Sequence, residues 1–143
     1  MKSVDEFYQE FKSRIADEFN SYLENLSLNR LEDVIDEHNF IDCKELTLAV
    51  YPSVTSGETI AFRENKWELM TTIELFVNDS YSMESNRTAE KYLFAFLTWL
   101  TQNSFSEYDC VESAVLIRMN ENADFNGFAL ELKSRINTDI DYF

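Results

Sequence analysis

The residues best suited to catalysis or metal binding lie in one acidic stretch of the chain. His38 is the single histidine, and Asp36, Glu37 and Asp42 flank it. A histidine beside carboxylates could act as a general base or bind a metal ion. No second histidine or cysteine pair accompanies it, and the acids around Asp33 have no EF-hand spacing or glycine turn. We therefore interpret His38 as a surface turn residue and the acids as a solvated face, and we expect no metal site.

Candidate nucleophiles and phosphate-binding loops are incomplete as well. Ser53, Ser56 and Gly57 form no G-x-S-x-G elbow, and the 2 glycines of the chain lie too far apart to build GxxxxGK[ST]. Cys43 and Cys110 are widely separated and belong to no CxxC pattern, which is typical of small buried hydrophobic residues rather than of a disulfide or a nucleophile. The sequence favours no catalytic residue and no cofactor, so we expect a protein that is not an enzyme.

The composition indicates one domain, residues 1–143. The 143 residues are 45% hydrophobic and 15% aromatic, enough for a sizeable core. Only 2 Gly and 1 Pro are present, so no flexible linker divides the chain. The N-terminal MKSVDEFYQEF is too acidic for a signal peptide, and no stretch approaches the roughly 20 apolar residues of a membrane span. We expect a soluble, cytoplasmic protein that does not bind membranes.

Net charge limits the possible partners. The formal charge is -15, from 27 acidic and 12 basic residues spread along the chain. This charge repels phosphate backbones and anionic lipids, and it disfavours specific nucleic-acid binding through a basic stripe. It favours a protein partner, or a surface past which nucleic acid slides without sticking.

Hydrophobic periodicity predicts two main helices. A capping box at residues 3–6 opens a long amphipathic helix that continues to Leu26. A shorter helical segment is expected over 28–37. The second main helix begins at Ser82 or Ser85, and its apolar residues extend so far around the cylinder that we expect it to be enclosed between other elements. The polar residues 101–107 end it.

Alternating apolar residues predict the strands. We expect a strand that Pro52 stops, a polar loop over 53–58, a short strand at 60–62, a turn at 64–66, a long strand over 67–79, and a final hairpin of 111–119 and 128–136 around a turn at 120–127. The predicted fold is α+β, an antiparallel and possibly mixed sheet with both helices on one face. The other face would carry Met70, Phe76, Ala114 and Leu116, and would need a second sheet, a folded-over strand or a neighbouring subunit to cover it.

The order of these elements carries a family resemblance. An extended LTLAVYPS segment, a Trp-led WELMTTIELFVND strand, the helix SNRTAEKYLFAFLTWLTQ and a closing hairpin resemble the tail terminator proteins of long-tailed phages, the minor tail protein U type, and related tail-completion proteins. The resemblance is one of pattern over most of the chain, with no diagnostic motif. It implies a subunit that forms a ring, commonly a hexamer, on the end of a tail tube and offers a surface to head–tail connector proteins. It also implies assembly in the host cytoplasm and then residence in the virion, with DNA passing through an acidic lumen.

Two hypotheses about function follow. The first is the ring-forming assembly protein, for which we expect protein-interface residues on the second sheet face and in the loops: Met70, Phe76, Ser53, Thr55, Asn122 and Phe125. The alternative is an acidic interaction module, an inhibitor or DNA mimic that occupies a basic groove of another protein. The oligomeric state separates the two.

Overall fold

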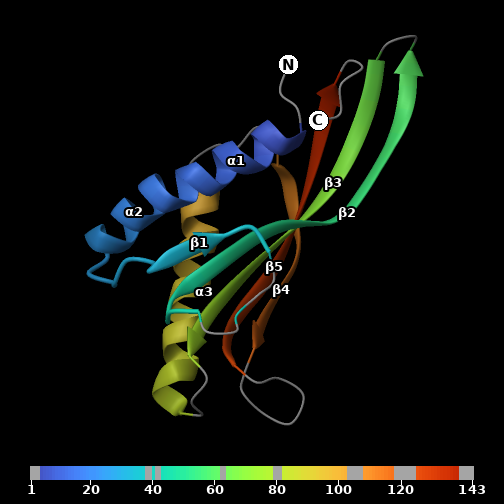
Figure 1. Cartoon of the computed structure of the whole chain (residues 1–143). Coiled ribbons are helices and arrows are strands. Elements are labelled where there is room, and N and C mark those ends of the chain that lie inside the picture. The colour runs from blue at the N-terminus through green and yellow to red at the C-terminus, as the bar shows by residue number, and fades with distance from the viewer. Residues whose placement is uncertain are drawn as a thin grey trace.

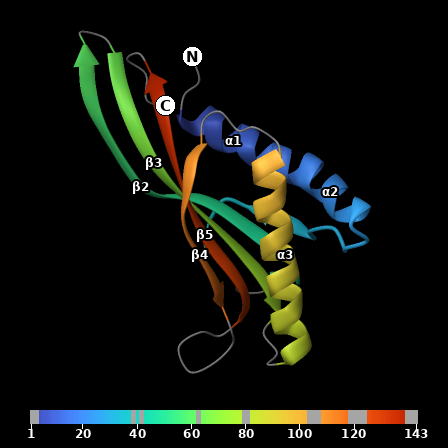
Figure 2. The same cartoon turned by 180° about the vertical axis from the view of Figure 1, so that it is seen from behind.

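The protein folds into one mixed sheet with helices on one side (Figures 1 and 2). The structure is a computed structural model that describes residues 4–37, 40, 43–61, 64–78, 82–102, 108–117 and 125–138. Its elements are α1 (Val4–Arg14), η1 (Ile15–Phe19), α2 (Asn20–Asn25), β1 (Asp33–Ile35), β2 (Thr47–Ala61), β3 (Glu64–Asn78), α3 (Met83–Gln102), β4 (Tyr108–Ile117) and β5 (Asn126–Thr138). The α+β prediction, with two main helical elements on one face, is confirmed.

The N-terminal helix runs as predicted but contains an irregular turn. α1 continues into η1, which is a π-helix, and then into α2 without a break. The helix ends in a Schellman arrangement, since Ser27 has a φ of 59° and the N–H of Leu28 donates to the carbonyl of Leu23 at 2.9 Å. A serine therefore occupies the left-handed position that is usually glycine. The predicted Ser3 cap lies outside the described residues.

The segment after this helix is not helical, which corrects the prediction for 28–37. Asp33–Ile35 forms β1 and pairs in parallel with β2, Val34 lying opposite Leu48. The apolar spacing of Leu31, Val34 and Ile35 fits a short helix as well as a strand, and only the partner strand decides between them. β1 makes the sheet mixed, in the order β1-β2-β3-β5-β4.

The central hairpin is much longer than predicted. β2 continues through Pro52 to Ala61, and β3 begins at Glu64, so the expected loop at 53–58 and turn at 64–66 are both strand. β1 pairs with β2 only as far as Ala49, so Pro52 lies where β2 is an edge strand, next to a bulge between Pro52 and Val54. Proline is tolerated at such positions because a missing N–H there breaks no ladder.

The closing hairpin is confirmed, and its second strand begins earlier than predicted. β4 and β5 pair antiparallel, and Gly127, predicted in the turn, already belongs to β5 opposite Phe76. A Cβ at Gly127 would lie 1.7 Å from the carbonyl oxygen of Leu75, so this close strand approach requires glycine.

α3 starts with the predicted cap. The Ser82 hydroxyl accepts a hydrogen bond from the N–H of Ser85 at 3.0 Å. Phe96 and Trp99 of α3 pack on Phe19 and the sheet, but Phe94 on the outer side is 58% exposed. α3 is therefore not enclosed on every side, in contrast to the prediction. The buried core of the helix-covered face comprises Phe11, Ile15, Phe19, Leu23, Leu31, Leu48, Val50, Ile73, Leu75, Val77, Ala89, Tyr92, Leu93, Ala95, Phe96, Trp99, Phe128, Leu130 and Leu132.

The second face of the sheet is covered within the chain at one end. Phe40, which follows β1, stacks on Phe76 with ring centroids 5.6 Å apart, and Phe125 lies 5.8 Å from Phe76 and 5.2 Å from Phe40. Leu116 was predicted on this face, but it packs against the helix-covered core because it pairs with Phe128. By the same register Ala114, opposite Leu130, shares the helix-covered side.

Candidate protein-interaction surfaces

A groove runs between the N-terminal helix and the segment that leads into β1. One hollow of about 450 Å³ is lined by Gln9, Lys12, Ser13, Ala16, Asp17, Asn20 and residues 30–34. A neighbouring hollow of about 660 Å³ is lined by residues 29–32, Glu45 and Leu46. Both hollows adjoin the segment Arg30, Leu31 and Glu32, beside the edge strand β1.

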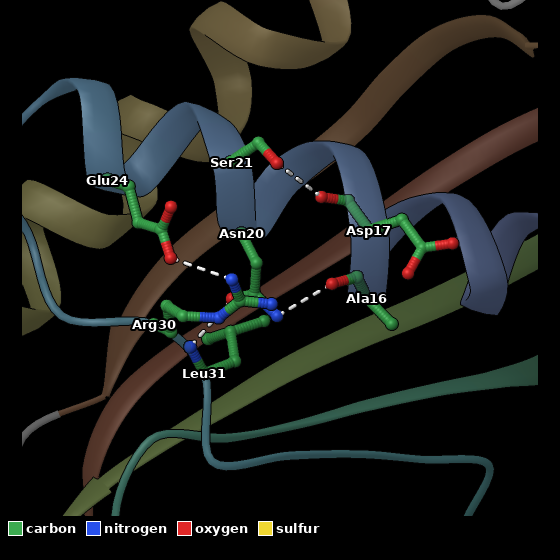
Figure 3. Close-up of polar contacts among 7 residues, drawn as sticks. All are labelled: Ala16, Asp17, Asn20, Ser21, Glu24, Arg30 and Leu31. Carbon is green, nitrogen blue, oxygen red and sulfur yellow. Dashed lines mark hydrogen bonds and ion pairs between the residues drawn. The ribbon is translucent and has the colours of Figure 1, made fainter.

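Asn20 positions both sides of this groove (Figure 3). Its Nδ2 donates to the carbonyl of Ala16 at 2.8 Å, and its Oδ1 accepts from the N–H of Leu31 at 2.7 Å. The side chain is only 5% exposed, so a buried backbone donor is satisfied by a residue eleven positions away. π-Helical turns recur at functional sites, and here η1 ends where Asn20 bridges the helix to the entry of β1.

Charges line the groove in both signs. Arg30 donates to Glu24 at 2.7 Å (Figure 3), and Lys12 lies 3.7 Å from Asp36. All four groups are substantially exposed, so each pair contributes little to stability. Asp17, Glu32 and Asp33 also line the groove, which makes it a mainly acidic surface suited to polar or basic ligands rather than apolar ones.

A second polar feature lies on the face opposite the helices. The Tyr51 hydroxyl of β2 donates a hydrogen bond to Glu74 of β3, whose side chain is 8% exposed. Burial raises the pKa of Tyr51 above its ordinary value of 10.0, and the hydrogen bond and nearby charge of Glu74 and the charge of Glu131 raise it further. Tyr51 therefore stays protonated and serves as a donor across the physiological pH range.

The predicted interface residues are distributed over different environments. Phe76 is 8% exposed and Phe125 half-buried, both in the aromatic cluster with Phe40. Met70 is half-buried on the same face. Ser53 and Thr55 lie in β2 rather than in a loop, and their side chains, like Asn122 as a whole, lie outside the described residues. Among the predicted residues whose side chains the structure describes, Phe76 and Phe125 lie together.

Other residues of these surfaces were not predicted. The contact of Asn20 with Leu31 was not predicted because Asn20 lies within a periodic helical stretch. The contact of Phe40 with Phe76 was not predicted because no sequence pattern links the two residues. Among the described residues no three His, Cys, Asp or Glu side chains are grouped so as to hold a metal ion. Cys43 is half-buried.

No protein-family model and no curated protein matches this chain. Within the part of the chain that the structure describes, no helix combines the length and the apolar character needed to cross a membrane.

Proposed function

We propose that this chain is a structural assembly subunit of the tail terminator or head–tail completion type, which forms a ring, commonly of six copies, on the end of a phage tail tube. The shape of the sheet is the observation that carries this proposal. β2 and β3 each span 15 residues, and their distal halves project beyond the helices together with the end of β5 (Figures 1 and 2).

A projecting arm suits assembly better than a stand-alone role. The pairing of β2 with β3 continues to Ala61 opposite Glu64, and β3 remains paired with β5 as far as Asn65. This three-stranded ribbon projects beyond the helical layer, and contact with another protomer or with a tail-tube protein would bury part of its surface. The charge of -15 suits a lumen through which DNA passes without adsorbing.

The solution mass tests this proposal. Light scattering after size exclusion, at several protein concentrations and at low and high salt, should give a species several times the 16.8 kDa chain, with ring-shaped particles in electron micrographs. Addition to polymerising tail tubes should stop their growth. A monomer at every concentration that also leaves tube length unchanged would contradict the proposal.

The acidic groove beside β1 favours a second candidate, an interaction module for a basic partner. Asp17, Glu32 and Asp33 line the groove, and its two bases, Lys12 and Arg30, are both engaged with carboxylates. Such a module predicts a monomer or dimer whose binding weakens steeply with salt. Replacing Asp17 and Glu32 together by Asn and Gln should abolish that binding without changing the oligomeric state.

A further inference from the structure

We propose that the protein assembles by continuing its own sheet: the outer edge of β4 in one copy pairs antiparallel with the part of the β2 edge that lies beyond β1 in the next copy. This inference rests on the proposed function and names the two surfaces that would join the protomers.

Both ends of the sheet offer a strand edge. β4 is the last strand of the order β1-β2-β3-β5-β4, so in the described part of the chain one of its edges faces no other strand of this sheet. At the other end β1 pairs with β2 only over Thr47–Ala49, which leaves the edge of β2 from Val50 to Ala61 beyond the reach of β1. An edge strand presents unpaired N–H and C=O groups that another chain can use.

The directions of the strands fit a head-to-tail union. β2 is antiparallel to β3, β3 to β5, and β5 to β4, so β2 and β4 run in opposite directions. A second copy placed beside β4 in the same orientation would therefore present β2 as an antiparallel partner. Antiparallel pairing already joins β2, β3, β5 and β4 within one copy. Because the two edges are different surfaces, the contact is heterologous and produces a ring when its rotation closes.

Each edge contains a regular stretch of similar length. β4 pairs with β5 without a register shift from Ser113 to Ile117, and its bulges lie before that stretch. β2 pairs with β3 without a shift from Val54 to Thr59, between its two bulges. The β2 stretch lies in the projecting arm and the β4 stretch nearer the helices, so neighbouring copies would be staggered along the strands, as tilted strands of a closed barrel are.

The chemistry of the edges favours a second copy as the occupant. Proteins usually protect long edge strands with lysine, proline or inward charges. The stretch from Ser113 to Ile117 carries no charge, and the stretch from Val54 to Thr59 carries only Glu58. Ala114 is exposed and Val115 is 56% exposed. In a chain of net charge -15, these are places where two copies can approach without strong like-charge repulsion.

Cross-linking between chosen edges tests the geometry. In a Cys43→Ser, Cys110→Ser background, Thr55→Cys and Val115→Cys are made singly and together, and the assembled protein is treated with a long, flexible bismaleimide. The double variant should give a ladder of covalent oligomers, while each single variant gives none. Covalent dimers from Val115→Cys alone would reveal β4 paired with β4, and would overturn the proposal.

A charge placed on the edge provides the second measurement. Val115→Lys should remove the assembled species from light scattering, or shift its appearance to at least tenfold higher protein concentration, with unchanged circular dichroism and urea midpoint. Phe94→Lys is the matched control, because Phe94 is similarly exposed, at 58%, but lies on α3; it should assemble as the wild type does.

The outcomes separate this inference from the proposed function. Assembly that survives Val115→Lys and gives no ladder between positions 55 and 115 would overturn the edge-to-edge contact, and the ring-forming role would stand on another surface. A wild-type protein that stays monomeric at all concentrations would overturn self-assembly itself and the edge contact with it.

Discussion

The two faces of the sheet are shielded from water by different means and, among the described side chains, to different extents. On one face, helices bury continuous apolar residues of β2, β3 and β5, with Ile73, Leu75 and Leu130 fully inaccessible. On the other, Phe76 is covered by aromatic rings from outside the strands, and Glu74 is buried with the Tyr51 hydroxyl as a donor. The stability of the helix-covered face comes from its buried apolar area, whereas that of the opposite face comes from a few specific contacts. Single substitutions on the two faces should therefore lower the free energy of unfolding by different amounts.

The largest effect is expected on the helix-covered face. Phe96 is fully buried and contacts Phe19 and Phe128, with ring centroids 5.0 and 6.1 Å away. Phe96→Ala should lower the free energy of unfolding by about 3–5 kcal/mol, because it removes a large apolar surface and leaves a cavity. Urea denaturation followed by circular dichroism measures this loss.

The same helix supplies the control for that measurement. Phe94 points outward and is 58% exposed, so Phe94→Ala should change the free energy of unfolding by less than about 0.5 kcal/mol. A comparable loss in both variants would mean that α3 is covered on its outer side as well.

The aromatic cluster on the opposite face should give the next largest effect. Phe76→Ala should lower the free energy of unfolding by about 3 kcal/mol, because Phe40 and Phe125 lose the ring on which they pack. The measurement belongs in dilute protein, where assembly does not contribute. If the dilute Phe76→Ala variant unfolds as the wild type does but no longer assembles at high concentration, Phe76 contributes to an interface between copies rather than to the fold of the single chain.

The sequence predicts the helix-covered face better than the opposite one. Helical periodicity is local, so α3 and its Ser82 cap were found, and the N-terminal helix was found except for its π turn. Strand pairing is not local. The polar segment 53–58 has the composition of a loop, and it becomes strand only because β3 pairs with it along its length. β1 is three residues long, too short for any periodicity to distinguish it from helix.

The candidate surfaces were harder to predict for the same physical reason. Asn20 and Leu31 are eleven residues apart, and Phe40 meets Phe76 and Phe125 only after the sheet has formed. A polar residue in a helix and a phenylalanine in a connection have no local signal for such contacts. The one sequence signal for contacts on the opposite face was in the strand predicted over 67–79, which carries Met70 and Phe76 where solvent-facing residues were expected.

A smaller effect is expected where the helix meets the entry of β1. Asn20→Ala removes the acceptor for the buried N–H of Leu31 and should lower the free energy of unfolding by about 2 kcal/mol. Asn20→Asp keeps the acceptor for the Leu31 N–H but loses the donor to the Ala16 carbonyl, so it should be destabilised as well. Hydrogen exchange at the Leu31 amide gives a local readout, and an exchange rate unchanged in Asn20→Ala would show that the bridge does not hold this segment.

The smallest effect concerns the Tyr51–Glu74 hydrogen bond and depends on pH. Tyr51→Phe removes the donor to Glu74 and should lower the free energy of unfolding by about 1 kcal/mol at neutral pH. The folded protein raises the pKa of Tyr51 above its ordinary 10.0, so above pH 10 the unfolded chain releases this proton first, and wild-type stability falls as the pH rises. The difference between wild type and Tyr51→Phe should therefore be constant below pH 9 and shrink between pH 10 and 11. Urea denaturation of both proteins across this range measures the difference in their free energies of unfolding. The other tyrosines and the lysines titrate alike in both proteins and cancel. A difference that stays constant to pH 11 would mean that Tyr51 titrates in the folded protein as it does in the unfolded chain.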